Sequence, residues 1–231
     1  MKMQYLGDSK DSFKWDYHDY LTSGLDYPIL NIAFMMTPND ASNEGKSRPE
    51  LFPAKGEILD YCNSLREIRN DSGTTLPVAI QKKIKKLPSI TNSKYQITLH
   101  KQDVFFTNEN RVEYFSGFSA EEDQVILLDP DNGFEPKKSL SRKHVSYIDI
   151  NDILDQISKN SVISVFQHFR RIPFKKDFAG IRERLKYFYS TAIYGHSLMF
   201  VAISKSKQSI NRVGELNAHY LKGKSKMEII A

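Results

Sequence analysis

The chain has 231 residues, a formal net charge of +5, and a hydrophobic fraction of 40% that includes 14 Phe and 12 Tyr. This apolar content excludes a wholly disordered chain, and the length fits one large domain or two small ones. Cys62 is the only cysteine, which excludes an internal disulfide and a zinc site built from cysteines.

The first half of the chain is predicted to be mainly helical. Apolar side chains recur at helical spacing in three segments, and a short apolar run of strand length lies between the first two. The predicted helices are residues 12–24, 54–69 and 77–86, and the predicted strand is residues 29–36. A long polar loop is expected between the strand and the second helix. We therefore expect residues 38–94 to form a helical and loop insertion within a single α/β domain that spans residues 1–231.

The second half alternates between apolar strands and helices. The clearest strand is residues 124–129, which is apolar throughout its centre, as expected of a strand that is covered on both faces. The other predicted strands are 146–148, 162–166 and 198–204, and residues 95–106 are predicted to form a pair of strands or one long strand. The predicted helices are 108–118, 150–157, 178–189 and 210–221. This alternation predicts an α/β fold with a mostly parallel central sheet and helices on both faces.

Polar side chains follow three of the predicted strands, at the point where each strand ends. Ligands of parallel α/β sheets bind beyond the carboxyl ends of the strands, so we expect the functional site at this edge. The side chains that follow the three strands are Thr37, Asn39 and Asp40; Asp129, Asp131 and Asn132; and Gln167, His168, Arg170 and Arg171.

Asp129 and Asp131 flank Pro130 directly after the central strand. Two carboxylates at this spacing can share a hard cation, so both are candidate ligands of Mg²⁺ or Mn²⁺. Alternatively, one carboxylate orients a substrate amine while the other stays solvated. A third interpretation is that residues 129–133 form only a turn before the next element, because proline, aspartate, asparagine and glycine are the residues that turns favour.

His168 and the two arginines that follow it indicate acid–base and phosphate chemistry. An imidazole titrates near neutral pH and can act as a general base, and Arg170 and Arg171 can bind phosphate groups. The alternatives are a structural histidine and a solvated pair of arginines. The net charge of +5 and several clusters of lysine and arginine are compatible with DNA or RNA as a partner, and also with an ordinary lysine-rich surface.

No membrane partner is expected from the sequence. The segment Met1–Asp8 lacks the apolar core of a signal peptide, and no apolar run approaches the roughly 18–20 residues that span a bilayer. We therefore expect a cytoplasmic protein. Nothing in the sequence indicates its oligomeric state.

Two segments carry a resemblance to a known family. The segment Gly7–Trp15, which opens a helix, has Gly, Asp and Lys at the spacing of the G-N-x-A-D-V-x-K-H motif. The segment Asp129–Asn132 stands where an Asp/Asn-Pro-Pro-Tyr/Phe tetrapeptide would follow the fourth strand. In these segments and in the order of its elements, the chain resembles Rossmann-like S-adenosylmethionine-dependent methyltransferases, most closely the RlmJ type of ribosomal-RNA adenine-N6 methyltransferase. It is also similar to uncharacterised bacterial and phage sequences with LDPDNG and QH motifs.

The resemblance implies roles for residues at matching positions. Asp129 would orient an adenine or other amine. The implied binding residues for S-adenosylmethionine are Gly7, Asp8, Asp11, Lys14, Thr37 and Asp40, and those for the substrate are Asn132, Gln167, Arg170 and Arg171. The chain departs from the pattern because it lacks the glycine-rich loop after the first strand, and because Asp131 and Asn132 replace the second proline and the aromatic residue.

Three functions from different classes follow. The first is a nucleic-acid-acting enzyme of methyltransferase-like fold, with adenine-N6 methyl transfer as its reaction. The second is a metal-dependent nuclease or phosphohydrolase, in which Asp129 and Asp131 hold Mg²⁺ or Mn²⁺ and His168 activates water. The third is a non-catalytic accessory protein of a phage, a defence system or a mobile element.

Overall fold

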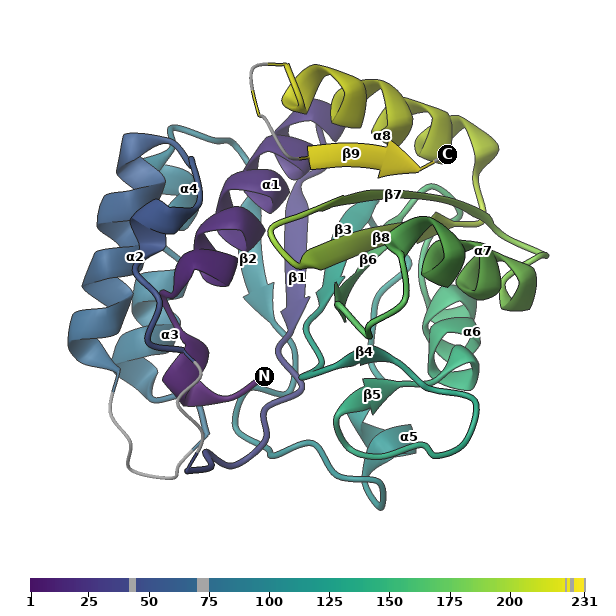
Figure 1. Ribbon diagram of the computed structural model, residues 1–231, viewed down its shortest axis with the longest axis horizontal. Helices are drawn as coiled ribbons and strands as arrows, with labels where there is room; N and C mark the ends of the chain where they lie inside the picture. The colour runs from purple at the N-terminus through teal and green to yellow at the C-terminus, as the bar shows by residue number, and fades with distance from the viewer. Residues whose placement is uncertain (42–44, 70–74, 223, 225–226, 231) are drawn as a thin grey trace.

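The computed structural model of the chain describes residues 1–41, 45–69, 75–222, 224 and 227–230, and contains a seven-stranded sheet in the order β2-β1-β3-β6-β8-β7-β9 (Figure 1). A second, two-stranded sheet lies beside the carboxyl ends of β1 and β3. The strands of the large sheet are β1 (Ile29–Ala33), β2 (Gln96–Leu99), β3 (Gln124–Leu128), β6 (Val162–His168), β7 (Tyr189–Gly195), β8 (Leu198–Ser204) and β9 (Met227–Ile230). The strands of the small sheet are β4 (Gly133–Phe134) and β5 (His144–Val145).

The sheet has a parallel half and an antiparallel half. Strands β2, β1, β3 and β6 are parallel neighbours, whereas β8, β7 and β9 join by antiparallel pairing. The α/β class is therefore confirmed, and the predicted parallel sheet describes the first half only. Strands β7 and β9 were not predicted, and the expected helix at 178–189 was wrong over its last residues. His196 and Ser197 both have positive φ, at 50° and 65°, which makes the tight hairpin between β7 and β8.

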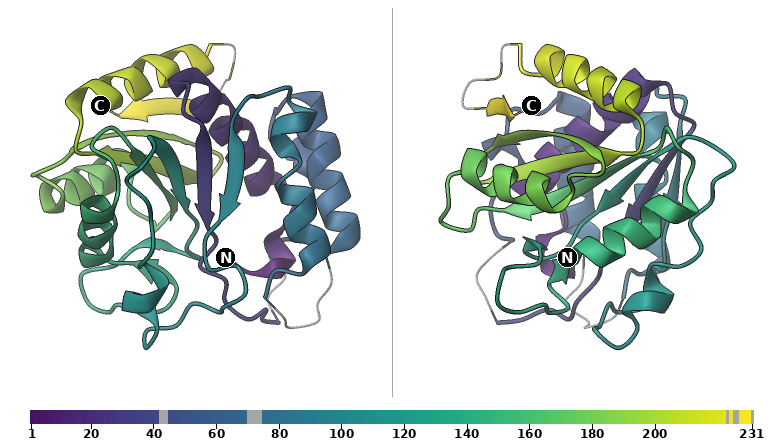
Figure 2. Two further views of the ribbon diagram at one scale, coloured as in Figure 1. Left: turned by 180° about the vertical axis from the view of Figure 1, so that it is seen from behind. Right: turned by 90° about the vertical axis from the view of Figure 1, so that its right-hand side faces the viewer.

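Helices cover both faces of the sheet, as predicted, and the two layers can be followed in Figure 2. One layer contains α1 (Ser9–Leu25), α2 (Gly56–Ile68), α3 (Val78–Ile84), α4 (Leu87–Ile90) and α8 (Lys207–Tyr220). The other contains α5 (Arg111–Tyr114), α6 (Tyr147–Gln156) and α7 (Phe174–Arg184). Two short 3₁₀ helices are η1 (Met3–Tyr5) and η2 (Pro49–Leu51). Among the described residues, no helix has the length and apolar character needed to cross a membrane.

The segment 38–94, expected as an insertion, is the connection between the parallel strands β1 and β2 and carries α2, α3 and α4. Such a connection between parallel strands must cross from one end of the sheet to the other, which explains its length. Residues 42–44 and 70–74 of this segment lie outside the described residues.

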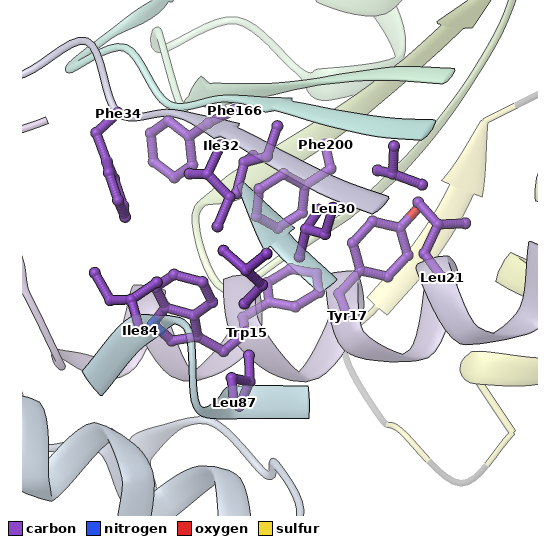
Figure 3. Packing of buried hydrophobic residues seen from close by; sticks show 14 of the residues in the cluster. Trp15, Tyr17, Leu21, Leu30, Ile32, Phe34, Ile84, Leu87, Phe166 and Phe200 are labelled. Atoms are coloured by element: carbon purple, nitrogen blue, oxygen red, sulfur yellow. The ribbon is translucent and has the colours of Figure 1, made fainter. Parts of the chain in front are cut away.

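Helix α1 is covered on nearly all sides, because it lies between the sheet and the helices of the β1–β2 connection. Figure 3 shows Trp15 of α1 surrounded by Ile84, Leu87 and Phe34. The Trp15 and Phe34 rings meet edge to face at 6.2 Å between centroids. A charged side chain on such a helix loses its hydration and needs an internal partner. The charged residues at the start of α1 must therefore pair with other polar groups inside the protein, and a polar site can form where they do so.

Candidate functional site

The start of α1 is fixed by three of the residues that the resemblance assigned to a cofactor. The Asp8 carboxylate caps the helix by accepting hydrogen bonds from the backbone N–H groups of Lys10 and Asp11, at 2.9 and 3.0 Å. Gly7 has φ 77°, and a Cβ there would lie 2.3 Å from the carbonyl oxygen of Cys62. The backbone N–H of Gly7 donates to Asp11 Oδ2 at 2.7 Å. The helix thus begins at Ser9 and not at residue 12, and this turn holds Asp11 in place.

Lys14 joins α1 to the end of the central strand β3. Its Nζ lies 2.5 Å from Asp11 Oδ1 and 2.6 Å from Asp129 Oδ2, and the Lys14 and Asp129 side chains are only 4% and 6% exposed. Burial works to lower the pKa of Lys14, but the two carboxylates outweigh it and the pKa is raised. Burial raises the pKa of Asp129, against the opposing effect of the Lys14 ammonium. The predicted meeting of the Gly7–Trp15 segment with this strand end is confirmed.

Asp131 faces the end of β1. Its Oδ2 accepts a hydrogen bond from Thr37 Oγ1 at 2.8 Å, and its Oδ1 lies 3.0 Å from the amino group of Met1. Burial works to raise the pKa of Asp131, but the Met1 ammonium and Thr37 outweigh it, so the pKa is lowered. Of the two other predicted residues after β1, Asp40 forms an ion pair with Lys2, and Asn39 Oδ1 accepts a hydrogen bond from Gln4 N at 3.2 Å.

The predicted Mg²⁺ or Mn²⁺ site at Asp129 and Asp131 stays a prediction. Each carboxylate has its own ammonium partner, Lys14 for Asp129 and the Met1 amino group for Asp131. Over the described part of the chain, no three His, Cys, Asp or Glu side chains come together in an arrangement that could hold a metal ion. These donors do not fit a shared metal ion without a change of partners.

His168 ends β6 on the other side of Asp129, and it contacts a residue that the sequence did not single out. Lys10 Nζ lies 2.6 Å from His168 Nε2. A lysine ammonium only donates, so Nε2 of His168 is the acceptor in this contact. The contact brings the tip of β6 to the first turn of α1. Thr37, Asp129, Asp131 and His168 thus gather at one edge of the sheet, as predicted.

Gln167 and Arg170 lie behind the site and do not face it. The fully buried Gln167 accepts a hydrogen bond from Phe134 N through Oε1, at 2.9 Å. Arg170 donates to both carboxylate oxygens of Asp177, at 2.6 and 3.2 Å, and to the Phe134 carbonyl at 2.9 Å. Both side chains hold β4, which follows the Asp129–Asn132 segment. Arg171 is exposed, with φ 61°.

Gly133→Ala should destabilise the chain by about 1–3 kcal/mol through the contact with Gln167. Gly133 has φ 104°, and a Cβ there would lie 2.2 Å from Gln167 Oε1 and 2.9 Å from its Cα. Gly117→Ala is the matched control, because φ is 86° and the space around it is open. Urea unfolding should show the larger loss for Gly133→Ala, and equal losses would contradict this account.

Two neighbouring clefts lie beside these residues. The inner cleft, of about 40 Å³, is bordered by Asp8, Lys10, Asp11, Lys14 and Asp129, among others. The outer cleft, of about 300 Å³, is lined by Lys2, Tyr5, Asp40, Asp131, Asn132, Lys143 and His168. Tyr5, Asp131 and His168 border both clefts. The clefts therefore lie side by side, the outer one bordered by Lys143 and the inner one by Asp129.

Asp8→Asn should stabilise the chain at neutral pH. Burial, and then the negative charge of Asp11, raise the pKa of Asp8 from 3.8 to about 6. Since the folded chain holds this proton more tightly than the unfolded chain, the carboxyl costs stability as the pH rises through this range. Asparagine keeps the N-cap, so the variant should exceed the parent by up to about 3 kcal/mol at pH 7 and match it near pH 4. Urea unfolding at both pH values tests this, and a difference that does not change with pH would contradict it.

Lys10 and Tyr5 are among the cleft residues that sequence reasoning missed, together with Met1, Lys2, Gly45 and Phe166. Lys10 lies four residues before Lys14, and this helical spacing was the available signal for it. Tyr5 follows from no local pattern, since the 3₁₀ turn η1 carries it into the clefts. No family model matches the chain, and no curated protein matches it, so a functional assignment depends on the geometry of these two clefts.

Proposed function

We propose that this chain is an enzyme of methyltransferase-like fold that acts on the amino group of a nucleic-acid base, with adenine N6 as the candidate acceptor. The observation that carries the proposal is Asp129. Its carboxylate lies at the carboxyl end of the central strand, is held by Lys14, and borders a cleft that leads to the surface. A fixed carboxylate in this place can accept hydrogen bonds from an amino group.

The strand order supports the Rossmann-like methyltransferase type. Strands β2, β1, β3 and β6 are parallel, and β8 then enters antiparallel between β6 and β7. An antiparallel strand inserted next to the last parallel strand resembles the sheet of those methyltransferases. Asp129 follows β3, which pairs with β1 on one side and β6 on the other. It therefore stands at the centre of the parallel half.

The inner cleft is bordered by charges of both signs, and the methionine part of S-adenosylmethionine has both an ammonium and a carboxylate. Asp8 and Asp11 supply negative charge, and Lys10 and Lys14 supply positive charge. When bound, the cofactor supplies an electrophilic methyl group. Ligand sites of this kind have about 300 Å³ or more, whereas the inner cleft has about 40 Å³.

In this proposal, Asp129 orients the amino group of the base, and Lys14 favours the ionised form of Asp129. Asp129 accepts an N–H of the amino group, which orients the nitrogen lone pair toward the inner cleft. Lys14 opposes the rise in the pKa of Asp129 that burial causes, and so favours the ionised carboxylate that can accept this hydrogen bond. Asp11, bonded to Lys14 and to the Gly7 N–H, keeps the lysine in position.

Titration calorimetry with S-adenosylmethionine, followed by transfer of a labelled methyl group to RNA and to DNA, tests the proposal. We expect heat of binding and label in one of the two nucleic acids. S-adenosylhomocysteine should compete in the calorimetry. Absence of both heat and label would contradict the proposal, and nucleic-acid cleavage that depends on added Mg²⁺ or Mn²⁺ would favour the hydrolase instead.

A further inference from the structure

A strongly basic loop follows the Asp129–Asn132 segment. Residues 135–143, the basic loop, connect β4 to β5 and contain Lys137, Lys138, Arg142 and Lys143 against a single acidic residue, Glu135. The first three of these basic side chains are exposed, and Lys143 is half-buried. Within the described residues, none of the four cationic groups forms a hydrogen bond or an ion pair. Their charges therefore do not stabilise the fold through hydrogen bonds or ion pairs.

The basic loop is anchored to the site through its backbone. Asn132 N donates to the Lys143 carbonyl at 2.9 Å, directly after the two carboxylates. From the other side, Arg111 donates to the Ser141 and His144 carbonyls at 3.2 Å, and an ion pair with Asp149 holds Arg111 itself. Figure 1 shows β4 and β5 next to the N-terminus, at the carboxyl ends of the parallel strands. The loop backbone is thus fixed next to the outer cleft, and Lys143 is the cation of the loop that lines this cleft.

The outer cleft lies between the basic loop and the inner cleft that Asp129 borders. Lys143 lies on its wall together with Asn132 and His168, and His168 also borders the inner cleft. The Asp129 side chain is only 6% exposed. A base that is stacked in a duplex cannot reach a group at this depth, whereas a base in a single strand can enter a cleft of about 300 Å³.

We propose that the basic loop binds the backbone phosphates of a single-stranded nucleic acid whose target base enters the outer cleft past His168. This inference rests on the proposed function and names the form of its substrate. Lys137, Lys138 and Arg142 contact phosphates outside the cleft, and Lys143 contacts the phosphate next to the inserted base. Such contacts carry no sequence information, so the loop provides affinity and position.

Fluorescence anisotropy with a labelled adenine-containing single-stranded oligonucleotide, measured over a range of salt concentrations, tests the inference. The variant K137Q/K138Q/R142Q should bind at least tenfold more weakly than the parent chain. Its plot of log affinity against log salt should be shallower by about 2, since each lost contact with a single strand removes about 0.7. The matched control K82Q/K85Q/K86Q removes the same charge in and after α3 and should bind within twofold of the parent.

Equal losses in the two variants would overturn the inference, because the effect would then come from net charge alone. Duplex binding as tight as single-strand binding would also overturn it. The oligonucleotide is bound without any cofactor, so this result is independent of methyl transfer. If only the loop variant loses affinity for the oligonucleotide and the parent chain transfers no methyl group, the inference stands and the proposed function is rejected. If the parent chain transfers methyl groups and the loop variant transfers them equally well, the proposed function stands and the inference is rejected.

Discussion

Asp129→Asn should lower the rate of methyl transfer by at least about 100-fold, the effect of removing one fixed polar group that acts on a reacting atom. The amide has nearly the same shape as the carboxylate but loses the negative charge that attracts the amino group. The variant should still fold, because Lys14 keeps its ion pair with Asp11 at 2.5 Å. The rate is measured under saturating cofactor and nucleic acid, and thermal unfolding checks the fold.

Asp131→Asn is the matched control for this prediction. It removes a carboxylate two residues away, whose partners are Thr37 and the amino group of Met1. We expect a loss of less than tenfold, since Asp131 does not contact the proposed acceptor. If both variants lose activity equally and the remaining activity depends on Mg²⁺, the two carboxylates share a metal ion and the role proposed for Asp129 is wrong.

The location of the candidate site could be predicted from the sequence because its signals are local. The strand 124–128 is apolar and is followed at once by two carboxylates, and this abrupt change places them at the edge of a buried sheet. The spacing of Asp11 and Lys14 puts both on one side of a helix. Each signal lies within a few residues of sequence, so it can be recognised without knowledge of the tertiary structure.

The partners of these residues could not be predicted, because they lie far apart in the sequence. Gln167 forms its bond to Phe134 across 33 residues, and Lys14 reaches Asp129 across 115. A polar residue at a strand end can face the site or hold a loop, and the local pattern is the same for both. This is why Gln167 and Arg170 were expected to bind substrate although they brace β4.

The antiparallel half of the sheet was missed for a related reason. The expected helix 178–189 continues past the end of α7 at Arg184 and reaches Tyr189, where β7 begins. The reversal into β8 depends on two consecutive residues of positive φ, His196 and Ser197, and neither is a glycine. Without a glycine at one of these two turn positions, the sequence has no strong signal for such a turn.

Lys14→Met should destabilise the chain by about 3–5 kcal/mol at pH 7, because it leaves the buried Asp11 and Asp129 carboxylates without their shared cation. Methionine fills similar space, so the loss measures charge and not volume. Urea unfolding gives the free energy of unfolding for the variant and for the parent chain.

The pH dependence of this loss separates an electrostatic cause from a packing defect. Burial already raises the pKa of Asp129, and removing Lys14 takes away an effect that opposes the rise. A carboxyl whose pKa is higher in the folded chain costs stability as the pH rises above its unfolded value, so the deficit of Lys14→Met should shrink between pH 7 and pH 5. The double variant Lys14→Met/Asp129→Asn should recover part of the loss at pH 7, because one of the two unpaired carboxylates is gone. The opposite outcome is a loss of stability that is the same at both pH values, with no recovery in the double variant. It would show that Lys14 contributes through packing alone, and that the ion pair does not hold Asp129 at the strand end.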